Sequence, residues 1–147
     1  MRDKGFTLIE MIIVIAIMTI LMYIGLMSFQ SITLKTRVEN DTKRIYGVDT
    51  MARQLTFACK DVLELKFEND NVTSYDGSGT RILELTSELE SDFSMSDNIT
   101  FRGGFIATGG LIKSTNTANA NATYDCIEFA KTRIRMGRME SGVCKTK

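Results

Sequence analysis

The stretch FTLIEMIIVIAIMTILMYIGLMSF, residues 6–29, decides the fold, because it is one apolar run with a single charged residue, Glu10. At 1.5 Å per residue, a helix of this length extends about 36 Å, enough to cross a hydrocarbon layer of roughly 30 Å. A removable secretory signal has a shorter apolar stretch followed by a small-residue cleavage site, and no such site follows this run. We therefore expect residues 6–29 to stay with the protein as a transmembrane helix.

Glu10 is the unusual residue of this helix. A carboxylate inside a membrane span costs about 2.5–3.5 kcal/mol to insert, so it needs a partner or a function. No Lys or Arg lies between Lys4 and Lys35. The nearest cation would be a free amino group at Phe6, created if the chain is cut after Gly5. The alternative is a plain membrane anchor that carries a chance carboxylate.

The sequence KGFTLIE at residues 4–10, followed by the apolar run, closely resembles the class III signal of type IV prepilins and type II secretion pseudopilins. The resemblance implies that prepilin peptidase removes residues 1–5 as a leader by cutting between Gly5 and Phe6, and that Phe6 is then N-methylated. It also implies that Glu10 pairs with the α-amino group of a neighbouring subunit's Phe6 during polymerisation. The leader would lie in the cytoplasm. The globular domain of this single-pass protein would lie outside the cytoplasmic membrane, and then in an extracellular pilus or periplasmic pseudopilus.

Beyond the membrane the helical pattern continues to residue 62. Apolar residues recur at helical spacing and predict one buried stripe, while the charged residues between them, Asp49 included, are predicted on the other faces. The stripe consists of Leu34, Val38, Ile45, Val48, Ala52, Leu55, Cys59 and Val62.

After Asp61 the apolar residues alternate with polar ones, which is typical of strands. Strands are predicted at 63–67, 72–75, 80–86, 99–102, 105–108, 124–130 and 132–139, with a turn at 76–79, an acidic loop at 87–98 and an exposed loop at 114–123. The predicted fold is α+β: a pilin fold in which a long N-terminal helix packs on one antiparallel sheet of about five to seven strands. The globular domain would span residues 30–147, with helix at 30–62, sheet at 63–140 and a C-terminal disulfide loop.

The three cysteines are Cys59, Cys126 and Cys144. Cys59 lies on the apolar stripe, which predicts a buried free thiol. Cys126 and Cys144 bracket the final strands, and we hypothesise a disulfide between them, similar to the terminal disulfide loop of many pilins. In the chain-entropy model it would stabilise the fold by about 3 kcal/mol, and it would require an oxidising compartment. Three cysteines without histidine do not resemble a zinc site.

Charge is unevenly distributed, although the net charge of the chain is zero. Residues 61–98 are strongly acidic and residues 131–147 are strongly basic. This pattern favours either complementary packing between subunits or an anionic partner for the tail; two solvated faces of one domain would also produce it. The tail residues Lys131, Arg133 and Arg135 would share one face of a strand, with Arg138 beyond a bend at Met136-Gly137, and such a row can contact DNA phosphates. Salt bridges from this row to the acidic loop at 84–97 are the alternative.

The sequence contains no catalytic constellation, so we expect no enzyme and no cofactor. Histidine is absent, the glycine pairs lack the lysine of a phosphate loop, and the carboxylates at 84–97 lack a metal-ligand spacing. The stretches ITFRGG (99–104) and FAKTRIRMGRM (129–139) resemble the end of minor pseudopilins of the GspH/FimT type. The expected function is a structural subunit of a type IV pilus or type II secretion-like filament, minor rather than major, whose partners are other pilin subunits. The alternatives are a major pilin, a DNA-binding minor pilin for DNA uptake, and an anchored surface protein that never polymerises.

Overall fold

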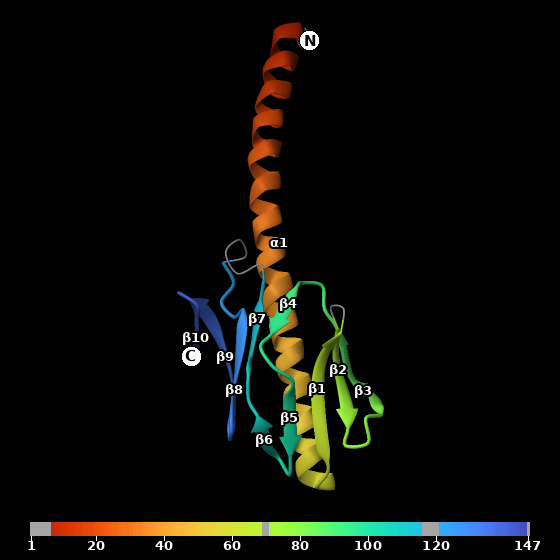
Figure 1. Ribbon diagram of the computed structural model, residues 1–147. Coiled ribbons are helices and arrows are strands. Elements are labelled where there is room, and N and C mark those ends of the chain that lie inside the picture. The colour runs from red at the N-terminus through yellow and green to blue at the C-terminus, as the bar shows by residue number, and fades with distance from the viewer. Residues whose placement is uncertain (1–6, 69–70, 116–120, 147) are drawn as a thin grey trace. The chain divides into compact units, whose positions relative to one another are not determined.

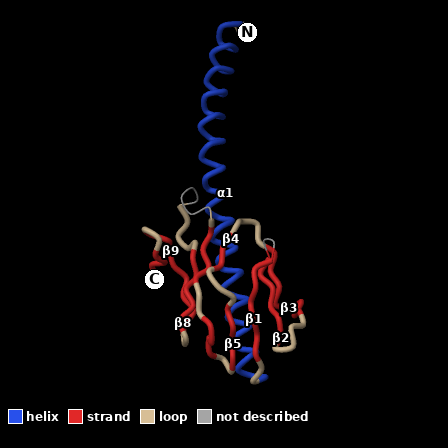
Figure 2. The backbone as a smooth tube through the Cα atoms, in the orientation of Figure 1, coloured by secondary structure: helices blue, strands red, loops and turns tan. Residues whose placement is uncertain are grey.

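The computed structural model describes residues 7–68, 71–115 and 121–146. Within these ranges it does not describe the side chains of Met27, Ser28, Glu68, Leu83 and Glu84. The described residues form one helix and ten strands, drawn in Figures 1 and 2: α1 (Leu8–Cys59), β1 (Val62–Glu68), β2 (Asn71–Asp76), β3 (Arg81–Glu88), β4 (Phe93–Met95), β5 (Ile99–Arg102), β6 (Phe105–Thr108), β7 (Leu111–Ser114), β8 (Cys126–Ala130), β9 (Arg133–Glu140) and β10 (Val143–Thr146). The chain divides into two compact units, Met1–Thr33 and Leu34–Lys147. The α+β class expected from the sequence is confirmed.

In the second unit, α1 buries one apolar row in the domain core. Val38, Ile45 and Ala52 are fully buried, while Leu34 and Leu55 of the predicted stripe are half-buried. Val38, Ile45 and Ala52 recur every seven residues, so they return to the same side of the helix after two turns. The predicted stripe is therefore confirmed along this part of α1.

A second buried row, which is polar, runs beside the first. Thr42, Asp49 and Thr56 follow the apolar residues by four positions each and are completely buried. The Thr42 hydroxyl donates to the Val38 carbonyl at 2.7 Å, and the Thr56 hydroxyl donates to a carbonyl one turn earlier at 2.9 Å. Neither carboxylate oxygen of Asp49 has a hydrogen-bond partner among the described residues. The prediction that Asp49 lies on a charged outer face is wrong, because the core reaches one position further round the helix than the apolar residues indicate.

The end of α1 also differs from the prediction. The helix stops at Cys59, and Lys60 adopts the left-handed conformation with φ of 56°. The chain therefore turns, and Val62 begins β1 instead of ending the helix. Cys59 is a free, exposed cysteine, so the predicted burial of its thiol is wrong.

The strands form two five-stranded antiparallel sheets, where one sheet was predicted. Their orders are β3-β2-β1-β5-β6 and β10-β9-β8-β7-β4. The expected turn before β3 is present, and Asp76 accepts hydrogen bonds there from the Ser78 and Thr80 amides at 2.9 and 2.7 Å. The two sheets meet where the Ile106 amide on β6 donates to the Lys131 carbonyl at 3.1 Å. A single domain can thus cover α1 with two sheets, each with its own strand order.

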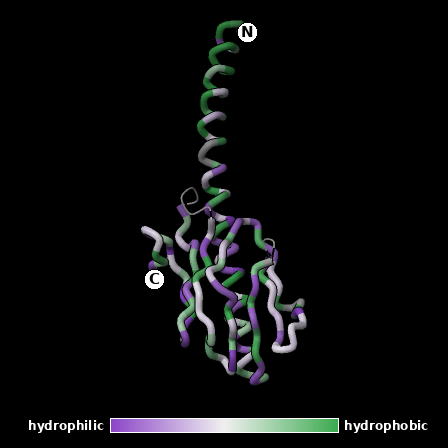
Figure 3. Tube along the Cα trace, viewed as in Figure 1, coloured by the Kyte–Doolittle hydropathy of each residue, from purple (hydrophilic) through white to green (hydrophobic). Residues whose placement is uncertain are grey.

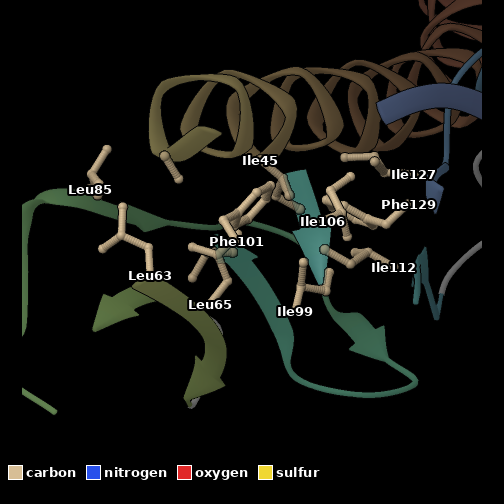
Figure 4. Packing of buried hydrophobic residues seen from close by; sticks show 12 residues of the cluster. Ile45, Leu63, Leu65, Leu85, Ile99, Phe101, Ile106, Ile112, Ile127 and Phe129 are labelled. Carbon is tan, nitrogen blue, oxygen red and sulfur yellow. The ribbon is translucent and has the colours of Figure 1, made fainter. Parts of the chain in front are cut away.

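One hydrophobic core joins α1 to both sheets, as Figure 4 shows. From α1 it takes Ile45 and Ala52; from the strands it takes Leu63, Leu65, Val72, Leu85, Ile99, Phe101, Ile106, Ile112, Ile127 and Phe129. Phe101 of the first sheet and Phe129 of the second meet edge to face, with ring centroids 6.5 Å apart. This contact ties the sheets together on the side that faces α1.

The loop predicted as exposed at 114–123 is partly buried. Ser114 and Ala122 are buried, and Ala122 packs with Val38 of α1. The Thr123 amide also donates to the Glu39 carboxylate at 2.7 Å. Partial burial raises the pKa of Glu39, but the hydrogen bonds from the Thr123 amide and side chain and the positive charges of nearby lysines together outweigh burial, so the pKa is lowered. Ala122 and Thr123, at the end of this connection, are therefore fixed to the helix.

Candidate functional site

The first candidate site is the apolar part of α1, from Leu8 to Ile32. Its large apolar side chains are exposed in the isolated chain, and Figure 3 shows green, hydrophobic stretches along this segment with paler turns between them. By length and composition, α1 is a candidate membrane span. The hydroxyls of Thr19 and Thr33 donate to carbonyls of the preceding turn at 2.8 and 2.9 Å, so neither needs water. An exposed apolar surface of this extent indicates burial in lipid or against other subunits.

Glu10 is held at the start of this segment by a reciprocal cap. Its carboxylate accepts hydrogen bonds from the Thr7 amide and the Thr7 hydroxyl, both at 2.9 Å. The Glu10 amide lies 3.4 Å from the Thr7 hydroxyl, to which it donates. This is the capping box of a helix N-terminus, and its T-x-x-E spacing is visible in the sequence. Glu10 therefore has a local partner in the isolated chain.

The predicted cleavage and methylation positions, Gly5 and Phe6, lie outside the described residues. The predicted pairing of Glu10 with a neighbouring amino group also stays a prediction, since it needs a second subunit. The described geometry fixes only the position of the Glu10 carboxylate, in the first turn of α1.

The second candidate site is the basic strand β9. Arg133 and Arg135 alternate with half-buried Ile134 and Met136 and share the exposed face of the strand. The strand continues through Gly137 without the predicted bend, so Arg138 points to the opposite face and donates to Asn121 at 2.7 Å. Gly137 is required there because a Cβ atom would lie 2.9 Å from the Cys144 sulfur and 2.5 Å from the Lys145 carbonyl oxygen. Because the predicted bend at Met136-Gly137 is absent, Arg138 does not join Arg133 and Arg135 on their face of the strand.

The basic face of β9 contains fewer cations than the sequence predicted. Lys131 lies in the turn before β9, and Glu128 lies directly across the strand pair from Arg135. Lys131, Arg133 and Arg135 are exposed and form no salt bridge with any described residue. The basic face thus consists of two arginines and a lysine at its end, with one carboxylate among them.

The acidic segment that follows β3 is bound to α1, and no described salt bridge joins it to the basic tail. Glu90 forms a salt bridge with Arg37 at 3.7 Å, and its amide donates to Asp41 at 2.9 Å. Arg44 donates to the Glu88 carbonyl at 3.4 Å. The alternative in which the tail arginines pair with this segment within one chain therefore does not occur among the described residues.

The C-terminal strands are joined by a disulfide between Cys126 and Cys144, whose Cα atoms are 6.0 Å apart. Asp125 precedes this bond, and its carboxylate accepts from the Met139 amide at 2.6 Å. Burial raises the pKa of Asp125, while the Met139 amide and the nearby Arg138 oppose the increase. The disulfide and these hydrogen bonds fix the end of the chain on the sheet edge.

Comparison with known proteins agrees with these observations. The family described as "Prokaryotic N-terminal methylation motif" matches residues 1–24. Two fimbrial proteins of Pseudomonas aeruginosa are each 31% identical to this chain over 116 residues, which cover 79% of this chain and 73% of the relative. No solved structure matches the chain. With an N-terminal methylation motif, a long apolar helix, an α+β domain and relatives that match along most of their length, the chain belongs to the type IV pilin family.

Proposed function

We propose that this protein is a structural subunit of a type IV pilus or a related filament. Prepilin peptidase would cut between Gly5 and Phe6 and the new N-terminus would be methylated. The mature subunit would remain anchored in the cytoplasmic membrane, with its domain outside the cytoplasm, until it polymerises through residues 6–29. The pilin family is a family of structural proteins, so the work of this chain is assembly and not catalysis.

The observation that carries the proposal is the exposed apolar segment with one carboxylate near its start. Seventeen large apolar side chains between Leu8 and Ile32 are more than two-fifths exposed in the isolated chain. Lipid covers them before assembly, and packed copies of the same helix would cover them afterwards. Glu10 is the single charge in this surface, so its pairing with a neighbour's amino group would set the register between helices.

Two substitutions separate this role of Glu10 from its local capping role. Glu10→Ala removes the carboxylate, whereas Thr7→Ala removes only the hydroxyl of the capping box and leaves the carboxylate in place. Both variants would be produced in the native cells, and the subunit would be quantified in the membrane and in filaments sheared from the surface. We expect Glu10→Ala to reach the membrane but not the filaments, and Thr7→Ala to reach both. Equal assembly of the two variants would argue against the proposal.

We propose a minor rather than a major subunit, on the resemblance of residues 99–104 and 129–139 to minor pseudopilins. The likeness to fimbrial proteins favours a pilus over a secretion filament. Immunogold labelling of sheared filaments tests the abundance directly. Labels at rare positions or at one end fit a minor subunit, and continuous labelling along the filament would make it the major pilin.

DNA binding is the second candidate function, favoured by the cations Lys131, Arg133 and Arg135, which are exposed and form no salt bridge within the described part of the chain. Binding through phosphates would weaken steeply as salt increases. A gel-shift titration with duplex DNA at low and moderate salt should show this dependence, and Arg133→Ala/Arg135→Ala should weaken binding. The matched control is Lys66→Ala/Arg81→Ala, which removes two cations from the other sheet. No complex at low salt, or equal loss in the control, would end this candidate.

A further inference from the structure

An apolar groove of about 420 Å³ opens beside the last two turns of α1. It is lined by Thr50, Arg53, Gln54, Phe57, Gly103, Gly104 and Phe105. The side chains of Phe57 and Phe105 are 72% and 60% exposed, which makes them the most exposed phenylalanines among the described residues of the domain. Two unprotected aromatic rings beside one groove mark a surface that a partner covers.

The groove is held open by fixed contacts between α1 and the turn that joins β5 to β6. Gly104 has φ of 81°, and a Cβ atom there would lie 2.9 Å from the Phe57 ring, so only glycine allows this approach. The Gly104 carbonyl accepts from the Arg53 side chain at 2.8 Å, and its amide donates to Thr56 at 3.3 Å. The turn cannot shift without breaking these bonds, so the groove is formed before any partner arrives.

Exposed cations surround this end of the domain. None of them forms a salt bridge with a described residue: they are Lys60, Arg81, Arg102, Lys131 and Arg133. The Ile106 amide donates to the Lys131 carbonyl, which places that turn next to β6 and Phe105. The groove lining itself contains one cation and no carboxylate. Two carboxylates, Asp61 and Asp76, also lie at this end, near Cys59 at the end of α1. The cations outnumber them, so the charge favours an acidic partner.

The same domain carries an acidic segment at its opposite end. Glu88, Glu90 and Asp92 are exposed, and the segment is bound to α1 beside Arg37 and Asp41. At 1.5 Å per residue along α1, Asp41 and the groove residue Phe57 are about 24 Å apart. Figure 1 shows the connection from β3 to β4 at one end of the domain and the end of α1, with the β5–β6 turn, at the other.

We propose that the groove receives the acidic segment 88–92 of a second copy, so that the domains stack head to tail. The inference rests on the proposed function, since it names a contact inside the filament, and it applies where two copies of this chain are neighbours: in a cluster of minor subunits or along the filament of a major subunit. Two different surfaces at opposite ends of one subunit make a heterologous contact, which repeats without closing and generates a filament. Covering Phe57 and Phe105 excludes water from the contact and strengthens the pairing of the carboxylates with the surrounding cations. The apolar segment of a neighbouring α1 fits the groove less well, because it offers the cations only Glu10.

Disulfide trapping in assembled filaments tests the contact. All chains carry Cys59→Ser, which removes the free thiol and leaves the native disulfide. The test chain adds Gln54→Cys in the groove and Glu88→Cys in the acidic segment. The control chain combines Gln54→Cys with Asp97→Cys, an exposed acidic position beside Gly110 and away from that segment. Sheared filaments are mildly oxidised and separated on a non-reducing gel.

The expected result is a shift of the test subunit from the monomer band to dimers and longer multiples, with the control remaining monomeric. Normal filaments without this shift, or with an equal shift in the control, would overturn the contact and leave the proposed function standing. If the wild-type protein reached the membrane but was absent from the filaments, the proposed function would fail and the contact with it. If Glu88→Cys itself stopped assembly, Asp92→Cys would replace it, and the same band shift would decide.

Discussion

Replacing the buried Asp49 by asparagine should stabilise the domain, by an amount that grows with pH. Asp49 is completely buried on α1, and neither oxygen of its carboxylate has a partner among the described residues. Burial without a compensating bond raises the pKa of Asp49 well above its usual range. Asparagine has nearly the same shape and cannot ionise, so Asp49→Asn removes the titration and keeps the packing.

The sign follows from proton binding in the two states. In the unfolded chain an aspartate loses its proton near pH 3.9, whereas native Asp49 keeps it to higher pH. Above the unfolded pKa the native state therefore binds more protons, and the free energy of unfolding decreases as pH rises until the native pKa is reached. The decrease is at most about 1.4 kcal/mol per pH unit, which gives an upper bound of about 4 kcal/mol between pH 4 and pH 7. At low pH the wild type and the variant should be nearly equal in stability.

The assay is urea unfolding of the full-length protein in nonionic detergent, followed by tyrosine fluorescence, at several values between about pH 4 and pH 7. The quantity of interest is the difference between variant and wild type, because the other carboxylates cancel in it. Asp97→Asn, the same substitution at an exposed position outside the core, is the matched control. A flat difference for Asp49→Asn, or an advantage that shrinks as pH rises, would refute the reasoning.

Two further predictions concern the stability of the same domain. Cys144→Ser should lower the free energy of unfolding by about 3 kcal/mol in urea, because it opens the terminal loop, while Cys59→Ser should leave it unchanged; equal midpoints for the two variants would contradict the structural role of the disulfide. Gly104→Ala should cost about 1–3 kcal/mol more than Gly79→Ala, because both positions have positive φ but only at Gly104 would the new methyl group meet a side chain. Thermal unfolding of the two glycine variants compares them directly, and equal losses would show that the phenylalanine beside Gly104 moves away without cost.

The sequence predicts the helix well, because its apolar residues are numerous and regularly spaced. Val38, Ile45 and Ala52 repeat every seven residues and are buried as expected. Thr42, Asp49 and Thr56 show the same seven-residue spacing, four positions after these apolar residues. A search for a polar repeat beside the apolar one would therefore have found the buried polar row. Apolar residues alone did not reveal it, since hydroxyl groups are buried at little cost once they bond to the preceding turn.

The arrangement of the strands was harder to predict, because it depends on pairing between distant segments. The alternation of Leu63, Leu65 and Phe67 predicts a strand, yet it does not tell which strands share a sheet. The helix ends at Cys59, before the left-handed residue Lys60, and lysine has no local preference that signals this conformation.

The candidate site, too, could be predicted from the sequence only in part. Glu10 stands out in the sequence because it is a lone charge in an apolar run. Its capping partner Thr7 was also visible, in the T-x-x-E spacing. The groove could not be predicted, because Phe57 and Gly104 are far apart in the sequence and meet only in the folded domain.

The most direct test of the central claim is mass spectrometry of the N-terminal peptide of this protein from purified, sheared filaments. A filament subunit processed as a pilin should be found there, and its first residue should be N-methylated Phe6 with residues 1–5 removed. Recovery of the protein only from the membrane fraction, with Met1 still at its N-terminus, would contradict the account.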